Sequence, residues 1–118
     1  MAKTYENLEA WIKGVEFAVS IYKITQSFPK EELYGLTSQI RRAVVSISSN
    51  IAEGAGRSSR KDFKRFVDIA MGSLNETESL LIVAYKLEFT NEKIYLSTKS
   101  KTEELGRILN GLKKYLNQ

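Results

Sequence analysis

Residues 36–56 of the chain have the sequence LTSQIRRAVVSISSNIAEGAG. The apolar side chains of this stretch recur at three- and four-residue steps, at Leu36, Ile40, Ala43, Val44, Ile47 and Ile51. Such spacing places them on one face of an α-helix. Gly54 and Gly56 follow the last apolar position, and glycine commonly closes a helix. The stretch therefore predicts an amphipathic helix whose apolar face must be covered by other elements.

The segment before it has the same periodicity. From about Tyr5 to Gln26, apolar residues recur at helical steps at Leu8, Trp11, Ile12, Val15, Ala18, Val19 and Tyr22. Pro29 ends this helix, because proline disfavours helical geometry in the residue before it. A short turn through residues 31–35 then leads into the helix of residues 36–56.

Two more helices are predicted after Gly56. Ser59 and Asp62 resemble a capping box, so a third helix begins there and continues to about Leu87. Thr90 or Asn91 can cap a fourth helix that extends to Leu116. A polar gap over residues 97–104 leaves the start of the fourth helix open.

Four helices joined by short connections favour antiparallel packing of neighbours. We therefore expect an all-α, antiparallel up-down-up-down four-helix bundle, with residues 1–118 as a single domain. Gly72 lies inside the third helix, where glycine costs roughly 1 kcal/mol relative to alanine. Its presence predicts close approach of a neighbouring element.

The composition argues against an enzyme. The chain has no cysteine and no histidine, which removes the commonest nucleophile, general base and metal ligands together. Neighbouring carboxylates such as Glu76 and Glu78 point to different sides of a helix. Gly54 and Gly56 follow a helix and lack the pattern of a phosphate-binding loop. We expect neither catalytic residues nor a metal site nor a cofactor.

The chain is expected to be soluble and cytoplasmic. Residues 1–7 lack the apolar stretch of a signal peptide. The longest apolar run, residues 80–85, is far shorter than the roughly 20 residues of a membrane span. The net charge of +4 is compatible with a nucleic-acid partner without requiring one.

A row of small polar residues accompanies the apolar face of the second helix. Its members follow at three- or four-residue steps: Gln39, Arg42, Ser46, Asn50 and Glu53. Equal rise on both helices of the hairpin places Ser73 level with Arg42, with Glu76 one turn away, so we expect Arg41 or Arg42 to pair with Glu76. The polar seam, as we call it below, comprises seven residues: Gln39, Arg42, Ser46, Asn50, Glu53, Ser73 and Glu76. A buried, hydrogen-bonded contact between helices or subunits is the favoured interpretation, and a ligand or nucleic-acid site is the alternative.

The turn after the second helix is basic. It contains a single acid, Asp62, and five cations: Arg57, Arg60, Lys61, Lys64 and Arg65. A helix N-terminus adds outward-pointing amides, which favour phosphate. The spacing of Phe63 and Phe66 predicts core positions for both rings. The turn is either a phosphate-backbone site or an ordinary solvated surface.

Specific strings of the chain resemble a known family. These are Gln39-Ile40-Arg41-Arg42-Ala43, Asn50-Ile51-Ala52-Glu53-Gly54 and Ala70-Met71-Gly72-Ser73-Leu74-Asn75-Glu76. They resemble the signature of the 23S ribosomal RNA intervening-sequence proteins, small bacterial four-helix bundles. That resemblance implies a ring-shaped homopentamer. The family is also similar to the accessory protein of diversity-generating retroelements, a basic pentamer that binds its reverse transcriptase and nucleic acid. The matching cationic positions would be Arg41, Arg42, Arg57, Arg60, Lys61, Lys64 and Arg65.

Two functions remain open from the sequence. The first is a non-enzymatic, oligomeric accessory protein that binds RNA or DNA through the basic turn. The alternative is a scaffold ring that docks a protein partner, such as a reverse transcriptase, without touching nucleic acid.

Overall fold

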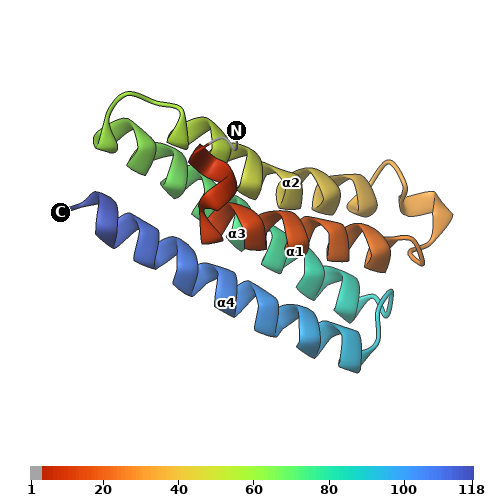
Figure 1. Ribbon diagram of the computed structural model, residues 1–118. Helices are drawn as coiled ribbons and strands as arrows, with labels where there is room; N and C mark the ends of the chain where they lie inside the picture. The colour runs from red at the N-terminus through yellow and green to blue at the C-terminus, as the bar shows by residue number, and fades with distance from the viewer. Residues whose placement is uncertain (1–3) are drawn as a thin grey trace.

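The computed structural model describes residues 4–118, so Met1–Lys3, in the stretch expected to lack a signal peptide, lie outside it. Four α-helices follow one another: α1 (Glu9–Thr25), α2 (Leu36–Ala55), α3 (Arg60–Lys86) and α4 (Glu92–Leu116). Two short 3-10 helices precede α1 and α2, η1 (Thr4–Asn7) and η2 (Lys30–Glu32). The predicted all-α four-helix bundle is confirmed (Figure 1).

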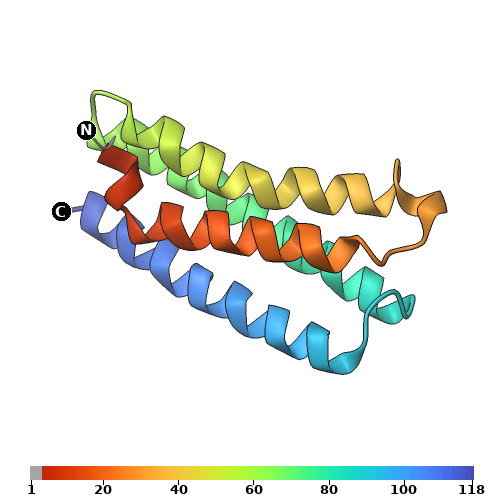
Figure 2. The same ribbon diagram turned by 45° about the vertical axis from the view of Figure 1, so that its right-hand side comes forward.

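The helices pack in a square, each beside its neighbours in sequence. α2 lies between α1 and α3, and α4 closes the square by packing on α3 and, less extensively, on α1 (Figure 2). The α2–α3 connection and the C-terminus lie at one end of this elongated bundle. The connections of residues 26–35 and 87–91 lie at the opposite end, called the Pro29 end below. Up-down-up-down topology follows directly from these short connections.

The apolar faces read from the sequence form the core. Ile40, Ile47 and Ile51 of α2 are fully buried, together with Ile21, Val67 and Leu109 from the other three helices. α2 approaches α3 closely at Gly54, where an added Cβ would lie 2.7 Å from Cβ of Phe66 and 2.8 Å from Cδ1 of Phe63. Phe66 therefore takes the core position that its spacing predicts, whereas Phe63 is partly buried and packs against the core.

The start of the chain differs from the prediction. Leu8 has extended backbone geometry and α1 begins only at Glu9, whereas the apolar pattern extends the helix back to Tyr5. The 3-10 turn of η1 instead lets the Tyr5 ring meet Trp11 edge-on at a centroid distance of 5.1 Å. Tyr5 thus continues the apolar pattern through its contact with Trp11, although it lies before the start of α1.

The helix caps agree with the sequence. Ser59 Oγ accepts a hydrogen bond from Asp62 N at 3.1 Å, and Asn91 Oδ1 accepts one from Ile94 N at 2.8 Å. Asn91, rather than Thr90, is thus the cap of α4.

The polar gap after Leu96 is fully helical. Its buried positions are Thr98 and Thr102, whose hydroxyls donate to carbonyl oxygens one turn earlier in α4.

The α2–α3 register differs from equal rise by one helical turn. Ser73 Oγ donates to Ser46 Oγ at 2.9 Å, whereas the sequence argument placed Ser73 level with Arg42. Counted from that contact, α3 extends about 6 Å further than α2 toward their connection, at 1.5 Å per residue. The first turn of α3 therefore projects beyond the end of α2.

Gly72 does not have the close neighbour that the sequence predicts. An added Cβ would meet nothing within 4 Å among the described residues, because Gly72 lies on the outer surface of α3. Within one copy of the chain, the helix tolerates this glycine without any packing reason for it.

Candidate nucleic-acid interface

The projecting first turn of α3 exposes the basic turn predicted from the sequence. Residues 57–65 contain five cations and one acid, so this segment carries as much net charge as the whole chain, +4. Four of the five cations are exposed and Lys64 is half-buried. Because the remainder of the chain is neutral in sum, this end is where a polyanion would be attracted.

Two of the arginines are already neutralised. Arg57 Nη2 lies 2.9 Å from Glu53 Oε1, and Arg65 Nε lies 3.0 Å from Asp62 Oδ1. Both guanidinium groups stack on the ring of Phe66, with Cζ 4.7 Å and 4.5 Å from its centroid. Phe66 is only 7% exposed, so its ring is unavailable to a nucleotide base. These two arginines are held in place but are only partly available for phosphate.

The other cations of the turn have no acidic partner. Within residues 4–118, no Asp or Glu side-chain oxygen lies within 4.0 Å of Arg60, Lys61 or Lys64. Arg60 Nη1 donates to the backbone oxygen of Tyr115 at 2.9 Å, and its Cζ lies 4.6 Å from the centroid of the Tyr115 ring. These three side chains are the available positive charge of the turn.

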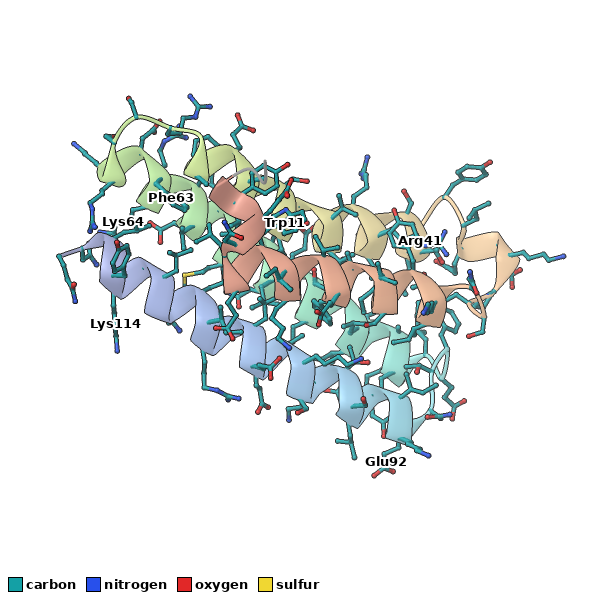
Figure 3. All side chains as sticks on the ribbon, viewed as in Figure 1. Trp11, Arg41, Phe63, Lys64, Glu92 and Lys114 are labelled. Carbon is teal, nitrogen blue, oxygen red and sulfur yellow. The ribbon has the colours of Figure 1, made fainter. Side chains whose placement is uncertain are left out.

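The fold adds α4 residues that sequence reasoning missed. The end of α4 brings Lys113, Lys114 and Tyr115 beside the start of α3; Lys113 Nζ pairs with Asp68 Oδ1 at 2.8 Å. Figure 3 shows Lys64 and Lys114 at the same end of the bundle. In the sequence these lysines suit only the C-terminal dipole of α4, since half the chain separates them from the turn. Residues 57–65 with 113–115 are called the basic end below.

Two predicted members of the cationic set lie elsewhere. Arg41 and Arg42 are in the second turn of α2, roughly 20 Å from its last residue at 1.5 Å per residue. Arg41 Nε donates to Thr25 Oγ1 at 2.9 Å, and the guanidinium lies over the ring of Tyr22 at 4.7 Å. Figure 3 shows Arg41 toward the Pro29 end, away from Lys64. Arg41 and Arg42 therefore lie apart from the five cations of the turn, and their contact with nucleic acid stays a prediction.

The polar seam is not buried within one copy of the chain. Its outer members, Gln39, Arg42, Glu53 and Glu76, are exposed on the α2–α3 face, and the other three are half-buried. At its centre Asn50 Nδ2 donates to Ser46 Oγ at 2.9 Å, and Ser46 Oγ also accepts from Ser73. Helical spacing predicted the shared face correctly, but burial depends on a covering element, and no described helix packs there.

The predicted ion pair with Glu76 does not form among the described residues. Arg42 and Glu76 line the same shallow pocket of about 270 Å³, together with Gln39 and Ser46, but no ion pair within 4.0 Å joins them. Arg41 turns to α1 instead. The register does not prevent the pair, because counting from the Ser46–Ser73 contact places Arg42 level with residue 77, next to Glu76. Both side chains are exposed to solvent, where an ion pair gains little.

A groove separates α1 from α4. Its wider part has a volume of about 590 Å³, with Leu8, Ala10 and Leu112 among its apolar lining and Arg107 at its rim. Glu104 lines both this part and a second pocket of about 170 Å³. Over residues 4–118, no cluster of three acidic side chains could hold a metal ion. Nor is any helix in that range long and apolar enough to cross a membrane.

Comparison with known proteins finds a matching family and similar solved structures. The sequence profile of the 23S rRNA-intervening sequence protein family matches residues 6–111. The chain is also similar to a protein of unknown function from the S23 ribosomal protein family of Bacteroides thetaiotaomicron. The two are 30% identical, with a TM-score of 0.82, over 89% of this chain and 95% of that chain. No curated protein sequence matches.

Proposed function

Because this chain belongs to the 23S rRNA-intervening sequence protein family, we propose that it is a non-enzymatic accessory protein of the cytoplasm that binds RNA or DNA as an oligomer. The basic end is the binding surface. The observation that carries the proposal is a cluster of cations that have no Asp or Glu partner in the described part of the chain: Arg60, Lys61, Lys64 and Lys114. Such charges bind phosphate by releasing counterions from the nucleic acid.

Oligomerisation is supported by two uncovered faces that share α2. On the α1–α2 face, Ile12, Val19, Tyr22 and Val45 are exposed, and Val19 is 49% exposed. On the α2–α3 face, Ile69, Val83 and Leu87 flank the polar seam, and Leu87 is 53% exposed. Contiguous exposed apolar surface of this kind marks an interaction site. A second copy that covers these faces would bury the polar seam. It could also approach the α3 backbone closely at Gly72, where no side chain stands in the way.

The placement of these faces suits a ring. They are different surfaces, so a contact between them is head-to-tail, and such contacts close into rings when the rotation allows. Adjacent faces of a square bundle point about 90° apart, whereas a ring of five needs about 108° between its two contacts and a ring of four about 90°. A small closed ring, the pentamer implied by the family, is therefore compatible with this bundle. α2 then lines its inner wall.

The proposal is tested by binding to a fluorescently labelled, structured RNA and to duplex DNA at increasing salt. We expect affinity to fall with a log–log slope of about −0.7 to −0.9 for each neutralised phosphate. The triple variant Lys61→Glu, Lys64→Glu and Lys114→Glu should weaken binding by at least tenfold and flatten this slope.

The matched control reverses three lysines away from the basic end, Lys23, Lys30 and Lys93, which gives the same net charge. All three are exposed, so the control should fold equally well and bind as the parent does. Equal losses in both triple variants would assign binding to total charge and refute the basic end. Absence of any binding at low salt would refute the function.

A scaffold without nucleic-acid binding is the second candidate, supported by the same exposed apolar faces. Here the chain would present α3 and α4 to a protein partner, such as a reverse transcriptase, and the basic end would be solvated surface. Co-purification from the native host decides between the two. Retention of a protein partner by the Lys61/Lys64/Lys114 variant, with no nucleic acid bound by the parent, would favour the scaffold.

A further inference from the structure

We infer that Tyr115 and Arg60 form a stacking platform for an unpaired base, so that the basic end prefers single-stranded segments of nucleic acid to a plain duplex. The inference rests on the proposed function and adds the class of ligand. It starts from an aromatic residue that no sequence motif singles out, since Tyr115 lies in the last turn of α4.

The pair is held in place by several contacts. The Arg60 guanidinium lies 4.6 Å from the Tyr115 ring centroid, and its Nη1 donates to the backbone oxygens of Tyr115 and Gln118 at 2.9 Å and 3.4 Å. A guanidinium stacks flat on an aromatic face through cation–π attraction. The Arg60 guanidinium therefore lies over one face of the Tyr115 ring, and this assembly is oriented before any ligand arrives.

This assembly remains open to solvent. Tyr115 is 56% exposed and Arg60 is exposed, unlike the Phe66 ring, which is buried beneath Arg57 and Arg65. Closing the end of α4 accounts for the hydrogen bonds from Arg60 to the carbonyl oxygens. This closing role does not require an aromatic residue at position 115. It also does not explain why the Tyr115 side chain is 56% exposed.

The charge around the platform favours a nucleotide over an apolar ligand. Arg60 has no Asp or Glu carboxylate within 4.0 Å among residues 4–118, in contrast to Arg57 and Arg65. Lys61 follows Arg60 directly, and Lys64 lies one helical turn further along α3. A base can stack on the ring–guanidinium pair while its phosphates meet these lysines, the combination that single-strand binding sites use.

The platform cannot stack on a base inside a continuous duplex. In a continuous duplex both faces of each base are already stacked, so no face is free for a protein ring, whereas loops, bulges and ends offer unstacked bases. The basic end should therefore bind duplex only through its phosphates and gain the stacking term only with unpaired nucleotides.

The test compares labelled oligonucleotides of equal length by fluorescence anisotropy: single-stranded RNA, single-stranded DNA, and a blunt DNA duplex. We expect Tyr115→Ala to weaken single-strand binding by about 5- to 150-fold, the range measured for loss of one stacked base. Duplex affinity and the salt slope should stay unchanged, because no phosphate contact is removed. Equal losses for RNA and DNA locate recognition at the base, and a loss confined to RNA adds a sugar contact.

Three variants separate stacking from stability. Tyr115→Phe should retain single-strand binding, and Arg60→Lys should keep the salt slope but lose part of the single-strand preference. Tyr34→Ala removes a tyrosine that is 94% exposed at the Pro29 end and should change nothing. Thermal unfolding followed by circular dichroism shows that each variant is folded at the assay temperature.

The outcomes distinguish the inference from the function beneath it. If the parent binds duplex and single strand equally, or Tyr115→Ala leaves single-strand binding intact, the platform is refuted while phosphate binding stands. If no oligonucleotide binds at low salt, both are refuted. Irradiation of an oligonucleotide carrying 5-iodouracil should crosslink the base to the peptide containing Tyr115; crosslinks found only elsewhere would overturn the assignment.

Discussion

At the scale of single residues, two glycines inside helices have opposite surroundings. Gly54 lies where α2 meets α3, and a methyl group there would press on Phe63 and Phe66 at less than 3 Å. Gly72 lies on the outer face of α3 with nothing within 4 Å among the described residues. Gly54 thus permits close packing of two helices. In the assembly proposed above, Gly72 would permit the close approach of another copy.

Gly54→Ala should destabilise the chain by about 1–3 kcal/mol, because overpacking costs more than the better helix propensity of alanine returns. Gly72→Ala should stabilise each copy by up to about 1 kcal/mol, since only propensity changes. Urea unfolding of both variants, with the midpoint and slope compared with the parent, measures this. A Gly54→Ala variant as stable as the parent would show that the phenylalanines move aside easily.

At the scale of elements, α4 is the helix with the least regular core face. Its second half buries Leu105, Leu109 and Leu116, but its first half buries Thr98 and Thr102. The threonine hydroxyls bond within the helix, and Thr102 Oγ1 lies 3.3 Å from Glu78 Oε2 of α3. Threonine buries less apolar surface than leucine, so tertiary packing holds this half less firmly.

Amide hydrogen exchange should therefore be faster in residues 93–104 than in residues 105–116, because local opening follows the buried apolar contact of a segment. Mass spectrometry of the exchanged peptides resolves the two halves. Uniform protection along α4 would mean that the helix opens as a single unit, and that its threonine-lined half is as firmly packed as the other.

The caps of α3 and α4 are also elements in which structure and sequence agree. Asn91→Ala should cost about 1 kcal/mol, within the usual 0.5–2 kcal/mol, because Ile94 N then lacks its side-chain acceptor. Thr90→Val is the control, because it keeps the shape of the half-buried side chain and removes only a hydroxyl that has no hydrogen bond among the described residues. Thermal unfolding should show a lower midpoint only for Asn91→Ala. A lower midpoint for Thr90→Val would move the cap by one residue.

At the scale of the whole molecule, charge and apolar surface are separated. The net positive charge gathers at one end of the bundle, while seven of the exposed large apolar side chains lie along the two long faces that meet at α2. Self-association through the long faces would leave all basic ends pointing the same way around a ring. Several copies would then hold one polyanion together, and avidity would exceed the affinity of a single copy.

Val19→Glu and Val83→Glu should each reduce the oligomer to smaller species, since a buried, unpaired carboxylate is strongly unfavourable in an interface. Light scattering coupled to size-exclusion chromatography gives the mass of each. Leu96→Glu is the matched control, because Leu96 is 52% exposed on α4, outside both faces. A parent that is monomeric at micromolar concentration, or a control that dissociates equally, would contradict the assignment of these faces.

The sequence alone determined what depends on local periodicity. Helical spacing of apolar residues specified four helices and the core positions of Ile40, Ile47 and Phe66, and the chemistry of Ser59 and Asn91 specified where two helices begin. These features are local, because a helix face and a cap involve residues three or four positions apart. The resemblance to the family, drawn from residues 39–54 and 70–76, rested on the same stretches.

Only the tertiary structure decided which distant residues meet. The register between α2 and α3 depends on how two side-chain surfaces interlock, which residue counting across the turn missed by one helical turn. That register placed Ser73 on Ser46. The polar seam stays at the surface because no described helix covers the α2–α3 face, and contacts with Thr25 and Tyr22 of α1 hold Arg41 toward the Pro29 end. It is also packing of α4 on α3 that carries Tyr115 to Arg60, because side chains fifty-five positions apart meet only through the closed bundle.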